Sequence, residues 1–364
     1  MDYPLFNSKA LGSSQTYDLN DAVDRRQYFE DKLGGKLEEL KTFLDTNTFL
    51  AFMLAKKSAG KGTYSKMFAE VVGENRVAHV SVGDIIRDVH KMIETDRTER
   101  AKLVEYLEAN YRGFLTIQDC LAALIGRSQT KPLPTEFILA LVRREVEKVG
   151  KKAIFIDGFP RTLDQISYSL YFRALMNLRD DPDFFVLIDI PETVIDERMK
   201  YRVVCPLCHT SRNLKLLPTK FVEYDKETGG FHLLCDNKAC TGYTKTRLTA
   251  KEGDDQGIAL IKDRLVLDGK LMDMALTLQG IPAVTLRNAV PIDQAKEYTE
   301  PYELTPAFSY EYDAKTNQVL TKAEPWTVKD DQGNPCHSLL AAPVLLSLMV
   351  QIHTLLIGES KNQL

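Results

Sequence analysis

Short apolar runs alternate with helical patterns along most of the chain. Five runs have the length and composition of strands: residues 49–54, 76–81, 153–157, 184–190 and 281–286. The first of them is unbroken, which suits a strand buried on both faces. Strands that alternate with helices favour a parallel sheet wrapped by helices. We therefore predict an α/β protein with a five-stranded parallel sheet and helices on both of its faces.

Both ends of the chain extend beyond this alternating pattern. Residues 1–47 contain a polar-rich helical pattern that starts near Asn20 and is broken at Gly34-Gly35. Such a stripe indicates an extension that packs on the core, and a partner-binding arm is the alternative. Residues 302–364 combine a hairpin signal with an apolar helical pattern, and they carry no recognisable chemical motif.

The turn after the first strand has the composition of a phosphate-binding loop. Residues 54–63 read LAKKSAGKGT and precede an apolar helical pattern. A strand, a small-residue turn and a helix direct backbone N–H groups toward an anion, and Lys61 would add a point charge. The consensus G-x-x-x-x-G-K-[ST] is incomplete, because Ala55 stands at the first glycine position and Gly62 separates Lys61 from Thr63. Alone, the segment fits an ordinary strand-to-helix turn equally well.

Charged residues accompany the later strands. Asp157 ends a central strand, and the carboxyl ends of such strands are where α/β sheets bind ligands. If the loop binds phosphate, Asp157 is placed to hold the waters of Mg²⁺. Arg198 and Arg202 are four residues apart and so lie on one face of a helix. In isolation these arginines, like Arg87, are ordinary surface residues.

Four of the six cysteines form two closely spaced pairs. The pairs are Cys205 with Cys208 and Cys235 with Cys240. This arrangement is typical of a structural zinc site with four thiolates, and unligated thiols are the alternative. Two nearby histidines, His209 and His232, are surface residues or further ligands. After the cysteines, residues 246–265 are predicted to return to helix.

The composition limits the partners of the chain. An apolar fraction of 44% and a charged fraction of 27% are those of a globular protein, and the net charge of −4 provides no basic footprint for nucleic acid. The N-terminus lacks the charged-then-apolar order of a signal peptide. The most apolar segment, residues 338–357, is interrupted by polar residues, whereas a membrane span needs about 18 apolar residues. We expect a cytoplasmic protein with neither nucleic-acid nor membrane partners.

Several of these segments together resemble the adenylate kinases. SAGKGT, SVGDIIR, DGFPRTLDQ, ERMKYRVVCPLC and two later arginines occur in that family's order within residues 49–286. The resemblance implies a P-loop nucleoside monophosphate kinase fold with a helical AMP-binding insert and a β-rich zinc-binding lid. The implied boundaries are 1–47 for an N-terminal helical extension, 48–82, 151–202 and 261–301 for the core, 83–150 for the insert, 203–260 for the lid and 302–364 for a C-terminal extension.

The resemblance also implies roles for individual residues. Reversible phosphoryl transfer from MgATP to AMP, giving two ADP, requires alignment and charge neutralisation rather than a strong base. ATP would be held by Ala59, Gly60, Lys61, Gly62, Thr63 and Arg198, and AMP by Val82, Arg87, Gly158, Arg161 and Gln165. The implied catalytic set is Lys61, Arg161, Arg198, Arg202, Arg247 and Arg264, with Mg²⁺ held through water by Asp157. Structural Zn²⁺ would be bound by Cys205, Cys208, Cys235 and Cys240.

The chain departs from the family pattern at four positions. Ala55, Lys57 and Ser58 replace the Gly, Pro and Gly that open the family's loop, and Val82 replaces a threonine. Loss of the two glycines removes conformational freedom for positive φ. Loss of the threonine hydroxyl at Val82 removes a hydrogen bond worth about 0.5–1.5 kcal/mol. A kinase for another nucleoside monophosphate and a non-catalytic nucleotide-binding or zinc-ribbon interaction protein are therefore alternatives.

For the leading interpretation, an adenylate kinase, we expect a monomer with ATP and AMP as substrates.

Overall fold

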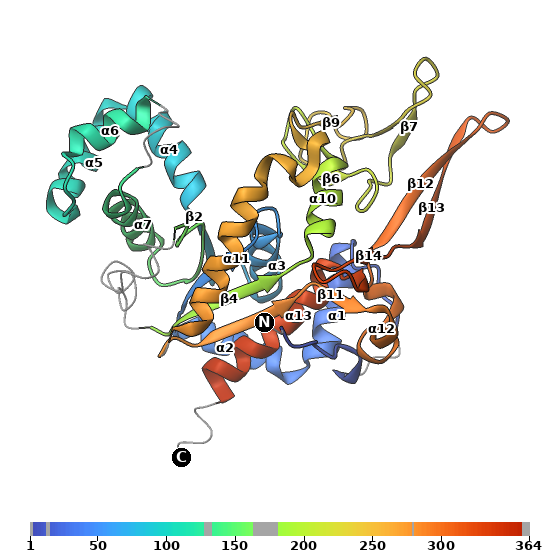
Figure 1. Ribbon diagram of the computed structural model, residues 1–364, viewed down its shortest axis with the longest axis horizontal. Coiled ribbons are helices and arrows are strands. Elements are labelled where there is room, and N and C mark those ends of the chain that lie inside the picture. Colours follow the sequence, from blue (N-terminus) through green and yellow to red (C-terminus); the bar gives the residue numbers. More distant parts are fainter. Residues whose placement is uncertain (1–2, 12–14, 127–132, 163–180, 279, 359–364) are drawn as a thin grey trace.

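A parallel five-stranded sheet in the order β10-β4-β1-β3-β2 forms the centre of the protein (Figure 1). The computed structural model describes residues 3–11, 15–126, 133–162, 181–278 and 280–358. The sheet strands are β1 (Leu50–Ala55), β2 (Val77–Ser81), β3 (Ala153–Asp157), β4 (Asp183–Asp189) and β10 (Ala283–Arg287). Every neighbouring pair is parallel. The predicted fold class, with its five strands, is confirmed.

Side chains of β1 alternate between two hydrophobic cores, one on each face of the sheet. Ala51 and Met53 belong to one core, and Leu50 and Phe52 belong to the other. The first core is completed by α1 (Ala22–Leu33), α2 (Gly35–Thr46), α3 (Lys61–Val72), α10 (Glu192–Lys200) and α13 (Ala341–His353). The second is completed by α4 (Val82–Thr95), α5 (Arg97–Asn110), α6 (Ile117–Ile125), α7 (Thr135–Val149) and part of α11 (Lys262–Thr277). Burial on both faces explains why the strands read as continuous apolar runs.

The helices α4 to α7 form a helical insert, with α5 and α6 farthest from the sheet (Figure 1). Each of the first three begins at a side-chain cap: Ser81 for α4, Asp96 for α5 and Thr116 for α6. These oxygens accept backbone N–H groups that the first helical turn cannot satisfy internally. Local sequence therefore fixes where these three helices start.

The N-terminal extension is part of the first core. Asp21 caps α1 by accepting from the backbone N–H groups of Val23 and Asp24, and Gly34, with φ of 52°, separates α1 from α2. Tyr28 and Phe29 are fully buried. The predicted helical pattern and its break at the glycines are confirmed.

Two small sheets follow α10, where the cysteine pairs lie. They are β5 (Arg202–Val204) with β6 (Ser211–Asn213) and β9 (Thr249–Ala250), and β7 (Val222–Tyr224) with β8 (Phe231–Leu233). The predicted helix at 246–265 is wrong in its first half. Residues there pair in β9, and a 3₁₀ segment, η2 (Asp254–Ile261), precedes α11. Gly257, with φ of 58°, interrupts that segment, and such a residue cannot continue a helix.

After β10 the chain adds a three-stranded sheet, a hairpin and a core helix. These elements are β11 (Ala289–Pro291), α12 (Ile292–Tyr298), η3 (Pro301–Glu303), the hairpin β12 (Pro306–Asp313) and β13 (Gln318–Pro325), β14 (Val328–Lys329), β15 (Pro335–Ser338), α13 and the final turn η4 (Thr354–Gly358). One further short turn, η1 (Lys9–Leu11), lies near the N-terminus. The predicted hairpin and apolar helix are confirmed.

The hairpin β12–β13 runs beside β7 of the cysteine-bearing region (Figure 1). Phe308 N donates to the Lys215 carbonyl at 2.7 Å, and Tyr310 Oη donates to the Leu214 carbonyl at 2.5 Å. Farther along, the rings of Tyr312 and Tyr224 stack with centroids 4.2 Å apart. Two parts of the chain that are distant in sequence therefore share one interface.

Residues 341–358 are long and apolar enough to cross a membrane. However, 61% of this stretch is buried inside the protein, chiefly against the first core. A core helix accounts for that pattern.

Glu303 links the N-terminal extension to the C-terminal extension through a buried hydrogen-bond network. Its carboxylate accepts from Ser8 Oγ at 2.5 Å, Tyr28 Oη at 2.6 Å and Glu300 N at 2.8 Å. Burial, followed by the Glu303 charge, raises the pKa of Tyr28 well above its usual value, so the phenol remains a donor.

We predict that Tyr28→Phe lowers the free energy of unfolding by about 1.5–3 kcal/mol, because it removes a buried hydrogen bond to a carboxylate. Urea denaturation measures the change. Tyr302→Phe is the matched control: its hydroxyl is buried and has no hydrogen-bond partner among the described residues. That control should change the free energy by less than about 0.5 kcal/mol. Equal losses in the two variants would contradict the assignment.

Candidate active site

The predicted phosphate loop runs from the end of β1 into α3. Gly60 has φ of 96°, which glycine adopts without steric cost, and the helix begins at Lys61. A helix start presents free N–H groups and the positive end of the helix dipole. Lys61 bends back across the turn: its Nζ donates to the Ala55 carbonyl at 3.2 Å and lies 3.6 Å from Asp157 Oδ1. This is the geometry of an anion-binding loop.

The three departures at the front of the loop have different structural consequences. Ala55 lies in the extended strand β1, where glycine is not required. Ser58 has φ of 66°, a left-handed conformation that costs an L-residue about 1–2 kcal/mol. The side chain of Lys57 is exposed, while its backbone N–H donates to Asp268 Oδ2 at 2.8 Å. Freedom for positive φ is therefore needed at position 58 and not at 55.

Arg87 and Arg161 converge beside the end of β3. A Cβ placed on Gly83 would lie 3.5 Å from Arg161 Nη2 and 3.5 Å from Arg87 Nη1. Gly158, with φ of 86°, allows Arg161 to pass even closer, since a Cβ there would lie 2.6 Å from the same Nη2. Arg87 also pairs with Asp84. Two guanidinium groups thus meet next to Asp157, the arrangement expected of a phosphate-binding pair.

Arg264 joins this cluster from α11. Its Nη1 donates to the Arg161 carbonyl at 3.3 Å, and its Nη2 lies 2.8 Å from Asp268 Oδ1. Burial, followed by the nearby Arg264 charge, lowers the pKa of Arg161, while Asp157 and Asp268 oppose that change. The cluster is therefore cationic and partly removed from water.

Arg198, on α10, lies next to the loop. A Cβ on Gly60 would be 4.0 Å from its Nη1. Its Nη2 donates to Asn288 Oδ1 at 3.4 Å, and burial lowers its pKa while Tyr64 opposes the shift. Within the described part of the chain it has no carboxylate partner. A half-buried guanidinium without a counter-ion is costly, so this position favours a bound anion.

The remaining two predicted arginines do not join the cluster. Arg202 makes a bidentate pair with Asp254, at 2.5 and 2.7 Å. Arg247 is exposed and pairs with Glu223 at 2.7 Å and Asp225 at 3.1 Å. Both arginines are therefore held by carboxylates of the cysteine-bearing region.

Other predicted ligands are placed as follows. Ala59 is buried in the loop, Gly62 lies against the His79 ring, and Thr63 is exposed. Val82 is buried at the start of α4. Gln165, the predicted adenine contact, lies outside the described residues.

Asn288, Tyr64 and Asp268 belong to the site but were not predicted. Asn288 is fully buried, and its Nδ2 donates to Tyr64 Oη at 3.2 Å. It follows the last sheet strand, so its position at the carboxyl edge was a usable signal. Asp268 stands one helical turn after Arg264, a spacing that also indicates contact.

The four paired cysteines come together into one cluster. Their sulfur atoms all lie within 4.8 Å of one another, with 3.6 Å between Cys208 and Cys235 and 3.9 Å between Cys205 and Cys240. Tetrahedral zinc with Zn–S bonds of about 2.3 Å requires sulfur separations of about 3.8 Å. The donor set and its spacing therefore fit zinc. The side chain of His232 lies near Asp225, at 3.8 Å.

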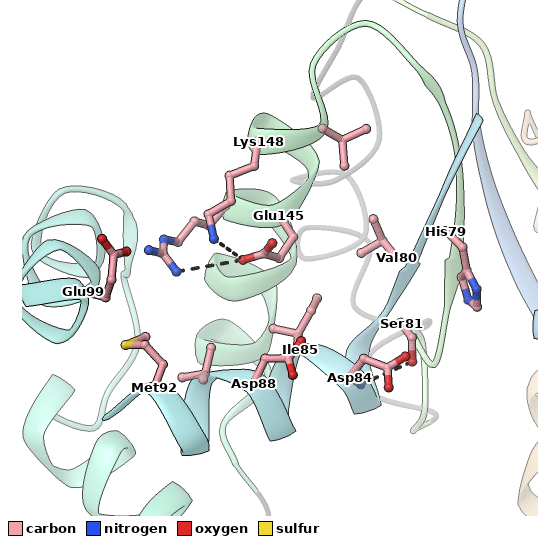
Figure 2. A pocket seen from close by; sticks show the side chains of 13 residues that line it. His79, Val80, Ser81, Asp84, Ile85, Asp88, Met92, Glu99, Glu145 and Lys148 are labelled. Atoms are coloured by element: carbon pink, nitrogen blue, oxygen red, sulfur yellow. Dashed lines mark hydrogen bonds and ion pairs between the residues drawn. The ribbon is translucent and has the colours of Figure 1, made fainter. Parts of the chain in front are cut away.

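A separate cavity of about 390 Å³ lies between β2, α4 and α7 (Figure 2). Its lining mixes charges: Glu145 pairs there with Lys148 at 2.7 Å, and Asp84 and Asp88 project from α4 (Figure 2). None of the predicted phosphate ligands is among the described residues that line it. The cationic cluster, rather than this cavity, is the candidate active site.

A parallel sheet with an anion-binding loop and converging arginines defines a P-loop class of protein. No protein-family model matches the chain. It is 32% identical over 209 residues to an adenylate kinase of Thermotoga petrophila, covering 57% of this chain and 75% of that protein, and 31% identical over the same length and shares to that of Thermotoga maritima. With an adenylate kinase of Clostridium novyi it shares 32% over 169 residues, covering 46% of this chain and 65% of that protein. The chain belongs to the adenylate kinase family.

We predict that Ser58→Gly raises the free energy of unfolding by about 1 kcal/mol, because glycine relieves the left-handed backbone strain. Thermal or urea denaturation measures the gain. Replacing Ser65, which lies in α3, by glycine is the control and should destabilise by about 0.5–1 kcal/mol. A loss of stability in Ser58→Gly would show that the loop is not strained.

Proposed function

We propose that this chain is an adenylate kinase that transfers a phosphoryl group reversibly from MgATP to AMP, giving two ADP. The observation that carries the proposal is the convergence of Lys61, Arg87, Arg161, Arg198 and Arg264 on the carboxyl edge of the sheet. Family membership supports it, since the relatives above are named adenylate kinases. Residues 83–150 would act as the AMP-binding insert and 203–260 as the lid.

The two substrates would occupy opposite sides of Asp157. Lys61 and the start of α3 would bind the ATP phosphates, with Arg198 alongside. Arg87 and Arg161 would hold the AMP phosphate, and Arg264 would lie between the two. The planar guanidinium of arginine binds phosphate oxygens in pairs. Its attraction to the phosphate is stronger where water is excluded. Val82 and Gly158 would border the AMP site, and Gln165 would contact the base.

The chemistry requires no strong base. The attacking phosphate oxygen is already ionised, so the residues act by alignment and by neutralising the negative charge of the transferred group. The Asp157 carboxylate lies 3.6 Å from Lys61 and could accept hydrogen bonds from the waters of Mg²⁺. The Mg²⁺ ion would neutralise charge on the ATP phosphates. Arg202 and Arg247 would contribute only after leaving their present carboxylate partners.

The cysteine cluster would hold structural Zn²⁺. Burial raises the pKa of Cys235 to about 12, so without a cation this thiol stays protonated. A bound zinc ion would stabilise the thiolates and join the two cysteine pairs, which contributes folding energy rather than catalysis.

We predict that Lys61→Met lowers kcat by about 10²–10³-fold, because a preorganised cation near the transferred group is lost. A coupled assay of ADP formation with ATP, AMP and Mg²⁺ measures the effect. Lys66→Met, an exposed lysine in the same helix, is the control and should keep the original rate. Absence of Lys61-dependent turnover would refute the proposal. A higher kcat/KM with GMP, CMP or UMP than with AMP would favour another nucleoside monophosphate kinase.

For the metal, we predict about one zinc per chain by elemental analysis. Cys235→Ser should lose that zinc and lower the melting temperature, whereas Cys336→Ser, a buried cysteine outside the cluster, should retain it. A fully folded protein without metal would contradict the assignment.

A further inference from the structure

One buried carboxylate connects the phosphate loop with an arginine of the candidate site. We propose that Asp268 is a positioning residue that fixes Arg264 and the front of the loop in a common geometry. This inference rests on the proposed function, because it assigns Asp268 an effect on phosphoryl transfer through Arg264.

The two oxygens of Asp268 have separate partners. Oδ2 accepts from the backbone N–H of Lys57 at 2.8 Å, and Oδ1 lies 2.8 Å from Arg264 Nη2. The Asp268 side chain is only 6% exposed, whereas that of Arg264 is 36% exposed. The Asp268 carboxylate is therefore held by its buried surroundings. The Arg264 guanidinium is held by Asp268 and remains partly exposed to solvent.

The contact with the loop depends on a departure from the family pattern. In the family pattern that the sequence resembles, proline stands at this position, and proline has no backbone N–H to donate. Lys57 supplies that donor, and Asp268 is the acceptor that satisfies it. The changed loop and the carboxylate on α11 thus form one structural unit, although 211 positions separate them.

The contact with Arg264 shapes the charge of the site. Arg264 also donates to the Arg161 carbonyl at 3.3 Å, so it is held at two points. Its charge lowers the pKa of Arg161, and the Asp268 charge opposes this effect. Asp268 therefore reduces the repulsion between two guanidinium groups that must lie close together before a phosphate is bound.

The position of Asp268 on α11 makes this orientation rigid. It stands four residues after Arg264, so both side chains project from the same face of one helix. Without the carboxylate, the long Arg264 side chain would sample other rotamers and turn away from Arg161. A displacement of about 1 Å at such a group can lower the rate about 100-fold.

A double-mutant cycle tests the inference. Asp268→Asn keeps an oxygen for the Lys57 N–H but removes the charge that holds Arg264. In the coupled assay we expect kcat to fall about 100-fold, with less than about tenfold change in KM for either nucleotide. In a chain that already carries Arg264→Ala, Asp268→Asn should lower kcat by less than about threefold, because the residue acts through Arg264. Asp273→Asn, an exposed carboxylate on the same helix, is the control.

A binding measurement separates this inference from the proposed function. Calorimetry with the bisubstrate compound P1,P5-di(adenosine-5′) pentaphosphate needs no turnover, and the same non-additive pattern is expected in its Kd. If the unaltered chain binds this compound but does not form ADP, the proposed function fails while the cycle in Kd still decides the role of Asp268.

If Asp268→Asn and Arg264→Ala change kcat and Kd independently, so that the fold-changes of the double variant equal the product of the single ones, the inference is overturned. A fall in activity explained by the unfolded fraction in a melting curve would also overturn it. If Asp268→Asn does not fold, Asp268→Glu takes its place, because it retains the charge and displaces it by one methylene. The same non-additivity with Arg264→Ala is then expected. If the unaltered chain neither binds the compound nor forms ADP, the inference fails together with the proposed function.

Discussion

Burial of β1 on both faces is the constraint on which the candidate site depends. All six residues of this strand are buried, so the chain turns only after Ala55. Parallel register places Met53 opposite Asp157, which brings the end of β3 beside the start of the loop. Lys61 then bends back toward both strands. The position of the phosphate loop relative to its acidic neighbour therefore follows from packing of the sheet.

The same packing leaves the site rich in positive charge. Burial lowers the pKa of both Arg161 and Arg198. The neighbours of Arg198 include two neutral groups, Tyr64 and Asn288. A desolvated guanidinium loses hydration that neutral partners only partly replace. The free protein thus holds an electrostatic cost that a bound anion would remove. Binding of a phosphate ligand and stability of the fold are for that reason coupled.

The sequence predicted the parts of this structure that depend on local pattern. Continuous apolar runs identified the five strands, and paired cysteines identified a cluster whose sulfur atoms do meet. Periodicity failed at 246–265, where β9 precedes the helix, because strand pairing with β5 overrides local preference there. Asn288 was missed because its partners Tyr64 and Arg198 are distant in sequence, and the contact between Asp268 and Lys57 was missed for the same reason. Resemblance indicated Arg202 and Arg247, but it could not show which carboxylates hold them.

The contacts between the hairpin β12–β13 and the cysteine-bearing region have a mechanical consequence. Tyr310 and Phe308 bond to the backbone near the base of that region, and Tyr312 stacks on its β7 strand. A rigid-body rotation of the region must therefore carry the hairpin along or break these contacts. The residues that flank the hairpin are held in place, Glu303 by the buried hydrogen-bond network and Trp326 by the first core, so a displacement of the hairpin would strain both anchors.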